Sequence, residues 1–189
     1  MMTGWRGKRT AATRGAVAPV EPASPAAGPA GRLRSMVPGD LADVMALEHQ
    51  LFPDDPWSEE MFAEEVTQPP GSRLYLIAEA GADAALVTAG YAGMMFVPGG
   101  VQADVLTIAV APAYWGQGIG SALLGALILA AGNRGCTEVF LEVREDNPRA
   151  RGLYLRRGFE EIGVRRGYYQ PSGVNAIVMR KDLPRSPSR

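Results

Sequence analysis

The sequence predicts a single α+β domain built around a mixed β-sheet. Its first half contains short apolar runs separated by turns rich in glycine and proline, which is typical of antiparallel strands. Its second half alternates strand-like and helix-like patterns and closes with two strand-like runs, an order that is typical of a mixed sheet. A chain of 189 residues that is 47% hydrophobic can bury one sizeable core.

Two helices are expected near the start of the domain, after a short edge strand over residues 31–36. Asp40 is a candidate N-cap, and apolar residues recur at helical spacing over 41–52. Ser58 is the candidate N-cap of a second, shorter helix, which the Pro69-Pro70-Gly71 sequence ends.

The remaining elements follow from changes in the hydrophobic period. Three strands that form an antiparallel meander are expected over residues 74–78, 86–97 and 101–110. After them we expect a helix over 118–132, a strand over 137–144, a helix over 147–157 and two strands over 159–168 and 174–181. Gly158 is a candidate C-cap for the helix that precedes it.

Charge is distributed unevenly along the chain. The net charge is −1, but residues 1–34 carry six basic residues and one acidic residue, whereas the remainder carries 13 basic and 19 acidic residues. An acidic body argues against a nucleic-acid-binding surface and is compatible with an amine substrate. No apolar run approaches the roughly 18 residues that a membrane-spanning helix needs.

Cys136 is the only cysteine and His49 the only histidine of the chain. A disulfide within the chain is therefore excluded, a zinc site is not expected, and the composition suits a reducing cytoplasm. Neither residue has a sequence context that predicts a nucleophile, because no histidine is near Cys136 and His49 is expected on the surface of the first helix.

The first 30 residues are rich in Ala, Pro, Gly and Arg and show no hydrophobic period. We expect a disordered tail over 1–30, a folded domain over 31–183 and a second tail over 184–189. Residues 1–30 lack the apolar central run of a secretory signal. An organellar transit peptide and a start codon placed too far upstream remain alternative explanations for this segment.

A glycine-containing segment over 115–121 follows an apolar strand and opens a helix. Glycines at such a position allow backbone N–H groups to converge on an anion, and the helix dipole favours a diphosphate. The alternative is an ordinary tight turn. The segment lacks the Gly-Lys-Ser/Thr of a P-loop and does not complete the three-glycine dinucleotide fingerprint.

Glu142 lies within the apolar run 139–143, where a carboxylate is costly unless it is paired or hydrated. Glu142 is therefore either an ion-pair partner of Arg144 or a general base that lines a cleft. Asn147 is a candidate N-cap for the following helix, whose first turn accepts proline. Tyr154 on that helix is either a core residue or an acid.

Taken together, these segments resemble the GNAT superfamily of acetyltransferases, and within it the RimI family. RimI enzymes acetylate the N-terminal alanine of ribosomal small-subunit protein eighteen. The resemblance covers roughly residues 31–182. The segments that carry it are 107–120, Leu141-Glu142-Val143-Arg144, Asn147, Gly152-Leu153-Tyr154, Gly158-Phe159, Pro56-Trp57-Ser58 and Arg165-Arg166-Gly167-Tyr168-Tyr169.

The resemblance implies a mostly antiparallel, twisted sheet that splits into a V around acetyl-CoA and is flanked by about four helices. It also implies direct transfer of the acetyl group to an α-amine, without a covalent enzyme intermediate and without a metal. Glu142 would be the base and Tyr154 the acid. The residues expected to bind acetyl-CoA are Ile108, Ala109, Val110, Gly116, Gln117, Gly118, Ile119, Gly120, Ser121 and Asn147.

Three positions depart from the family pattern. Trp115 stands where the family usually has Gln or Arg, and Gly116 stands where Arg is common, so a weaker hold on the cofactor is expected. Asn175 stands where an acidic residue is common, which leaves the peptide preference open. Trp57 is expected to be a packing anchor at the entrance of its helix.

The expected partner is the N-terminus of a ribosomal or other protein. We expect the chain itself to be a cytoplasmic monomer that binds neither nucleic acid nor membrane. Two alternatives stay open. The chain could acetylate a small amine such as an aminoglycoside or a polyamine. It could also be a non-catalytic acyl-CoA-binding module, because basic residues are missing at positions 115 and 116.

Overall fold

The computed structural model describes residues 32–53, 56–68, 71–81 and 86–184. The tail expected over 1–30 and nearly all of that over 184–189 lie outside these residues. Within them, one sheet contains seven strands: β1 (Arg32–Ser35), β2 (Arg73–Ala80), β3 (Val87–Phe96), β4 (Gln102–Val110), β5 (Glu138–Arg144), β6 (Glu160–Tyr169) and β7 (Val174–Asp182). Four helices flank it: α1 (Leu41–Leu51), α2 (Glu59–Val66), α3 (Ile119–Asn133) and α4 (Pro148–Arg156).

The strand order is β1-β2-β3-β4-β5-β7-β6. Strands β2, β3 and β4 form the antiparallel meander that the sequence predicts, and β1 is the expected edge strand, paired antiparallel with β2. The last two strands form the expected antiparallel hairpin, with β7 inserted between β5 and β6. The mixed sheet with its helices therefore confirms the predicted fold class.

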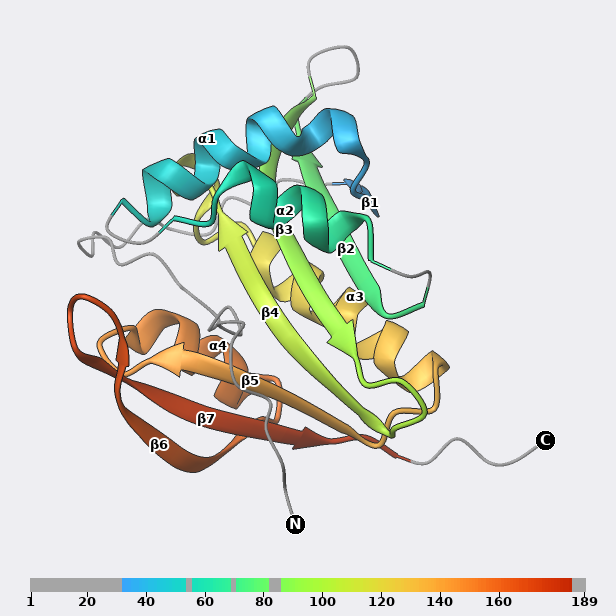
Figure 1. Cartoon of the computed structure of the whole chain (residues 1–189), viewed down its shortest axis with the longest axis vertical. Coiled ribbons are helices and arrows are strands. Elements are labelled where there is room, and N and C mark those ends of the chain that lie inside the picture. Colours follow the sequence, from blue (N-terminus) through green and yellow to red (C-terminus); the bar gives the residue numbers. More distant parts are fainter. Residues whose placement is uncertain (1–31, 54–55, 69–70, 82–85, 185–189) are drawn as a thin grey trace.

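The centre of the sheet is split. β4 and β5 run parallel, and their register joins only residues 102–104 to residues 138–140. Beyond that short ladder the two strands diverge, as Figure 1 shows, so that β4 continues toward α3 while β5 leads into α4. The V that the family resemblance implies is thus formed by the last six residues of β4, 105–110, and the end of β5.

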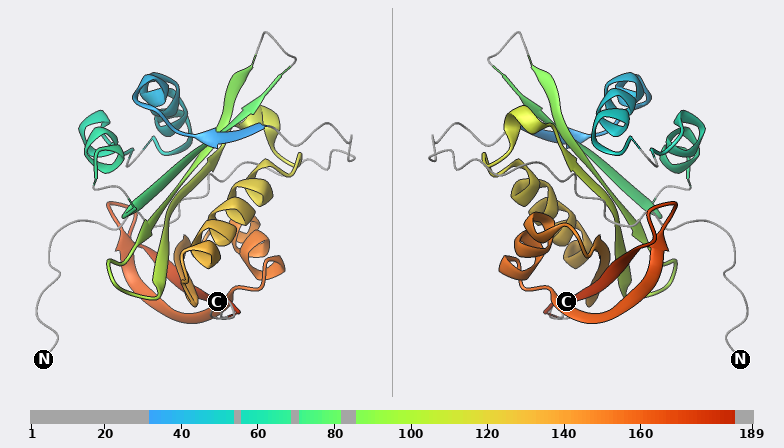
Figure 2. Two further views of the ribbon diagram at one scale, coloured as in Figure 1. Left: turned by 90° about the vertical axis from the view of Figure 1, so that its right-hand side faces the viewer. Right: turned by 90° about the vertical axis from the view of Figure 1, so that its left-hand side faces the viewer.

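Helices cover both faces of the sheet (Figure 2). The larger core lies between the sheet and α3, whose buried residues Ile119, Leu123 and Leu127 recur at every fourth position, and it extends to Tyr154 of α4. A second core lies between the opposite face and helices α1 and α2, and it includes Leu106 of β4. Burial of one large apolar side chain contributes roughly 1.5–3 kcal/mol, so each face is held by several such contributions.

The second core contains a buried carboxylate that the sequence analysis did not single out. Glu48 is only 1% exposed, accepts a hydrogen bond from the backbone N–H of Trp57 at 2.9 Å and accepts another from the Tyr91 hydroxyl. Trp57 packs on Phe62 with 4.8 Å between ring centroids. Trp57 is therefore the expected packing anchor, and Glu48 fixes the backbone that carries it.

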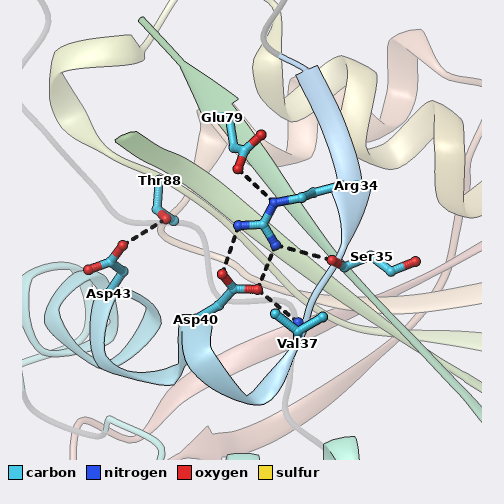
Figure 3. A network of polar contacts seen from close by, with 7 residues as sticks. All are labelled: Arg34, Ser35, Val37, Asp40, Asp43, Glu79 and Thr88. Atoms are coloured by element: carbon cyan, nitrogen blue, oxygen red, sulfur yellow. Dashed lines mark hydrogen bonds and ion pairs between the residues drawn. The ribbon is translucent and has the colours of Figure 1, made fainter. Parts of the chain in front are cut away.

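Arg34 joins three elements at the start of the domain (Figure 3). Its guanidinium donates to Glu79 of β2 at 2.6 Å and to both carboxylate oxygens of Asp40 at 2.6 and 2.7 Å. Asp40 also accepts from the backbone N–H of Val37 at 2.8 Å. The Arg34 hydrogen bonds, with a smaller contribution from Val37, hold the pKa of Asp40 below its usual value.

This network corrects the capping role predicted for Asp40. Asp40 occupies the N-cap position of α1, but its side chain makes no capping hydrogen bond to that helix. The reason is that Pro38–Asp40 forms a 3₁₀ turn continuous with α1, which gives Asp40 a helical backbone and directs its carboxylate back toward Val37.

The caps predicted for Ser58 and Asn147 are confirmed, because their side chains accept from the backbone N–H groups of Met61 and Ala150.

The structure also bears on membrane insertion. Across the described ranges, no helix combines the length and the apolar character that crossing a membrane requires.

Candidate functional site

A cavity of about 300 Å³ lies where β4, α3 and α4 meet on the α3 side of the sheet. Its walls come from the open arm of the V, from the loop before α3 and from one side of α4. The lining residues are Ile108, Ala109, Val110, Tyr114, Trp115, Gly116, Gly118, Ile119, Gly120, Ser121, Asn147, Arg149, Ala150, Leu153, Tyr154, Arg156 and Arg157. All the predicted site residues except Gln117 and Glu142 are among them.

The end of β4 offers free backbone groups to this cavity. Ala109 pairs with Tyr91 of β3, and the N–H of Ala111 donates to Ala89 of the same strand. Because backbone groups alternate sides along a strand, the N–H groups of Ile108 and Val110 face the split. This refines the prediction for Ala109, which lines the cavity although its N–H and C=O face β3.

The loop before α3 exposes the N-terminus of that helix. Gly116 and Gly118 have φ values of +79° and +84°, a conformation that strongly favours glycine. The first hydrogen bond of the helix runs from the N–H of Ala122 to the carbonyl of Gly118. The N–H groups of residues 119–121 therefore have no partner within the helix, and this is the arrangement that binds phosphate groups.

Trp115 closes the loop onto β4 by donating from its indole nitrogen to the carbonyl of Val110 at 2.7 Å. The guanidinium of Arg149 lies 4.6 Å from the centroid of the Trp115 ring. Burial lowers the pKa of Arg149, and no carboxylate pairs with it among the residues that the structure describes. A partly desolvated cation at this position favours an anionic ligand.

Positive charge in the cavity comes from α4 and the turn that follows it. Arg149, Arg156 and Arg157 line the cavity, whereas no Asp or Glu is found among its described lining residues. Arg157 also donates to the Ser121 carbonyl at 2.9 Å and to the Ser121 hydroxyl, and so ties α4 to the first turn of α3. The charge that the sequence lacks at positions 115 and 116 is therefore supplied from another helix.

Asn147 and Tyr154 lie on the α4 wall of the cavity. Asn147 is 1% exposed, and its side-chain oxygen caps α4 by accepting from Ala150 at 3.1 Å. Tyr154 is also 1% exposed and packs edge-on against Phe159 with 6.0 Å between ring centroids. Burial raises the pKa of Tyr154, so its hydroxyl keeps its proton at neutral pH.

Glu142 lies on the other face of the sheet. Val139, Leu141 and Val143 point into the core that contains Tyr154, and strand alternation directs Glu142 to the opposite side. Its carboxylate is 12% exposed and forms an ion pair with Arg165 of β6 at 2.7 Å. The two side chains thus approach the split from opposite faces, so the base and the acid that the family resemblance implies do not line one cavity.

The alternative ion pair between Glu142 and Arg144 is not the one formed. Arg144 pairs with Asp146, with a distance of 2.7 Å between Nη2 and Oδ2.

Gln117 turns away from the cavity and donates to the carbonyl of Ala113 at 3.1 Å. Asn175 accepts from the N–H of Gly167 and donates to Glu145, so it ties β7 to β6 and to the end of β5.

Two further residues near Glu142 were given no role by the sequence analysis, although Tyr169 belongs to one of the segments that carry the family resemblance. Asp104 of β4 is largely buried, and burial together with the nearby Glu142 carboxylate raises its pKa to about 6. Tyr169 is 5% exposed, and its hydroxyl has no hydrogen-bond partner in the described structure. An aspartate inside the apolar run 101–110 was the available signal for Asp104, whereas nothing in the sequence distinguishes Tyr169 from its neighbour Tyr168.

The structure argues against covalent catalysis by the single cysteine. Cys136 is 4% exposed, and burial raises the pKa of its thiol, whereas a reactive cysteine needs a lowered pKa. His49 is exposed on α1, as predicted. No cluster of metal-ligating side chains is present among the described residues.

Comparison with known proteins shows similarity to N-acetyltransferases. Residues 41–159 match the model of the acetyltransferase (GNAT) family. The chain is 42% identical over 139 residues to the N-alpha-acetyltransferase RimI of Mycobacterium tuberculosis, which covers 72% of this chain and 82% of that protein. It is 38% identical over 151 residues to the uncharacterized protein ML0378 of Mycobacterium leprae; this match covers 78% of the chain but only 40% of that longer protein.

Among solved structures, the chain resembles the ribosomal-protein-S18-alanine N-acetyltransferase from Escherichia coli. The TM-score is 0.70 at 31% sequence identity, and the superposition covers 83% of this chain and 96% of the other. The similarity therefore extends over nearly the whole described domain.

Proposed function

The chain belongs to the acetyltransferase (GNAT) family, and from that premise we propose that it transfers the acetyl group of acetyl-CoA to the N-terminal α-amine of a protein. The observation that carries the proposal is the cavity on the α3 face. It combines a free helix N-terminus, three arginines and the outward N–H groups of Ile108 and Val110. These features suit a long ligand that is anionic at one end and carries a thioester carbonyl at the other.

The residues of the cavity fit acetyl-CoA in a simple division of roles. The N–H groups of residues 119–121 and the guanidinium groups of Arg149 and Arg157 would hold the phosphates. The N–H groups of Ile108 and Val110 would polarise the thioester carbonyl, as an oxyanion hole does.

Glu142 would receive a proton from the incoming ammonium group on the opposite face of the split. An α-amine has an unperturbed pKa of about 7.7–8.0, so its deprotonation near neutral pH needs little driving force. The neutral amine then attacks the thioester carbonyl directly, the nitrogen releases its second proton to solvent, and the carbon–sulfur bond breaks. Tyr154, which keeps its proton because it is buried, would donate that proton to the departing sulfur.

The names of the relatives support a protein N-terminus as the acceptor, and specifically the N-terminal alanine of ribosomal protein bS18. A RimI of M. tuberculosis and an alanine N-acetyltransferase of E. coli are both similar to the chain over most of its length. Membership of the family alone leaves the acceptor open, and the names of these relatives are the reason to propose bS18.

An acetylation screen tests the proposal. Full-length protein is incubated with acetyl-CoA and a set of peptides that share the bS18 N-terminal sequence and differ only in the first residue, with spermidine as a competing small amine. We expect the Ala-initiated peptide to be acetylated fastest and spermidine to compete poorly. Preferential acetylation of spermidine, or no acetylation of any peptide, would reject the proposal.

A further inference from the structure

Asp104 and Glu142 lie on one face of the sheet, where β4 and β5 begin to diverge. Asp104 is the last residue of β4 in the parallel ladder and faces Phe140 of β5. Ala103 and Val105 on either side of it point into the α3 core, so strand alternation directs Asp104 to the opposite face. Glu142 follows Phe140 by two residues and therefore lies on that same face.

The two carboxylates are unequally neutralised. Glu142 pairs with Arg165 at 2.7 Å. For the Asp104 carboxylate, no ion pair or hydrogen bond is found within the described part of the chain, although it lies in the electrostatic field of both Glu142 and Arg165. Two carboxylates and one guanidinium leave the cluster with one uncompensated negative charge. Because the two carboxylates are largely buried while Arg165 is 53% exposed, a cation that restores neutrality beside them is favoured.

Tyr169 gives an independent indication that a polar ligand belongs here. Its hydroxyl is buried and unpartnered, and such groups are uncommon because an unsatisfied buried hydroxyl costs roughly 1–3 kcal/mol. Burial, then the Glu142 carboxylate and the nearby Tyr154 phenol, raise the pKa of Tyr169, so the Tyr169 hydroxyl lies within electrostatic range of both residues. Tyr169 therefore lies near both the base and the acid of the proposed reaction.

We propose that Asp104, Glu142 and the Tyr169 hydroxyl form the subsite that binds the acceptor in its ammonium form, with Asp104 as a second ammonium-binding carboxylate. The proposal rests on the function proposed above and deepens it. A primary ammonium carries three N–H donors, and this cluster offers three side chains with oxygen acceptors. The bound ammonium also neutralises the cluster, since two carboxylates are then balanced by Arg165 and the ligand. The proton that leaves the nitrogen goes to Glu142, while Asp104 stays ionised.

This subsite predicts selection for a charged amine before chemistry begins. A peptide and its des-amino analogue, in which a hydrogen replaces the terminal amine, differ only in the group that the subsite recognises. Wild-type protein saturated with CoA is expected to bind the Ala-initiated peptide at least about tenfold more tightly than its des-amino analogue, because hydrogen bonds to a charged group contribute more than neutral ones.

The test is calorimetric titration of both peptides into wild type and Asp104→Asn, each with CoA present. Asp104→Asn is expected to reduce the preference for the amine severalfold, to raise the KM for the peptide and to leave the KM for acetyl-CoA unchanged. Asp104→Glu, which keeps the carboxylate, is expected to restore part of the preference. Glu138→Gln is the matched control, because it removes a carboxylate four residues from Glu142 that pairs with Arg180.

The outcomes separate this inference from the proposed function. A wild type that acetylates peptides, together with an Asp104→Asn variant whose preference for the amine is unchanged, would overturn the ammonium subsite alone. A wild type that acetylates no peptide would overturn the proposed function. Equal loss of preference in Glu138→Gln would show a general effect of sheet charge and would also overturn the subsite.

Discussion

Glu142 and Tyr154 are separated by the sheet itself, and this separation gives each side chain a distinct test. Glu142 forms no part of the cavity that would hold acetyl-CoA, whereas Tyr154 lies on its wall. A role in proton removal and a role in cofactor binding can therefore be measured independently.

Glu142→Gln is expected to lower kcat by at least about a hundredfold, as the loss of a general base does. Acetyl-CoA affinity should change little, because the side chain faces away from the cavity. Steady-state kinetics and a direct binding titration measure the two quantities. A variant with wild-type kcat would make Glu142 a structural ion-pair partner of Arg165.

Arg149→Ala is expected to weaken CoA binding by about tenfold, since a charge-assisted contact to phosphate is lost. The effect should shrink as salt is added. Arg151→Ala is a suitable control on the same helix, because Arg151 pairs with Glu161 and does not line the cavity. Equal effects of the two substitutions would mean that the net charge of α4, rather than the position of Arg149, attracts the ligand.

The raised pKa of Asp104 also predicts that the stability of the fold depends on pH. Its folded pKa of about 6 lies above the value of about 3.9 that an unfolded chain shows, so the folded state binds the proton more tightly. Ionisation of Asp104 therefore destabilises the fold progressively as pH rises from about 4 to about 6, and the full penalty remains above that range. Asp104→Asn should be more stable than wild type at pH 7.5, with a difference that vanishes near pH 4 in thermal denaturation. A destabilised variant at pH 7.5 would contradict this account.

At the scale of elements, the Arg34 network holds β1, the turn before α1 and β2 together. Arg34→Met is expected to cost roughly 1–3 kcal/mol of unfolding free energy, since Asp40 and Glu79 lose their partner while largely buried. The lowered pKa of Asp40 means that this contribution is present above about pH 4 and is lost as pH falls through that pKa. Urea denaturation should therefore show a large difference in unfolding free energy between wild type and Arg34→Met at pH 7 and a small one at pH 3. Equal differences at the two pH values would contradict the ionic origin of the effect.

Local signals explain which elements could be predicted. The caps at Ser58 and Asn147 and the glycines before α3 act within a few residues, so their consequences are visible in the sequence. The place of β7 between β5 and β6 depends on pairing between distant strands, which no local pattern encodes. Asp40 departs from its predicted role because a 3₁₀ turn is added directly before the helix.

The cavity was predictable from the sequence to a different degree on its two sides. The β4 and α3 residues follow from one continuous segment, 108–121. Arg149, Arg156 and Arg157 were not foreseen, because their approach to that segment depends on how α4 packs beside α3. The face on which Glu142 lies could have been read from alternation with Leu141 and Val143, but its ion pair with Arg165 required the tertiary structure.

At the scale of the whole molecule, the split sheet separates charge of opposite sign. The α3 face presents a cavity with three arginines and no acidic lining residue among those described, whereas the cluster of Asp104, Glu142 and Arg165 on the other face has one more carboxylate than guanidinium. Under the proposed function, this charge separation would direct a polyanionic donor and a cationic acceptor to opposite sides of one opening. It would also allow a chain with a net charge of −1 to bind the anionic ligand that we propose.

The most direct test of this arrangement is the structure of the protein bound to a conjugate in which CoA is joined to the nitrogen of an Ala-initiated peptide. Our account predicts the diphosphate at the N-terminus of α3 beside Arg149, the linking carbonyl between β4 and β5, and the peptide leaving on the side of Asp104 and Glu142. A conjugate whose peptide portion leaves on the α4 side, with Glu142 remote from the linking nitrogen, would contradict it.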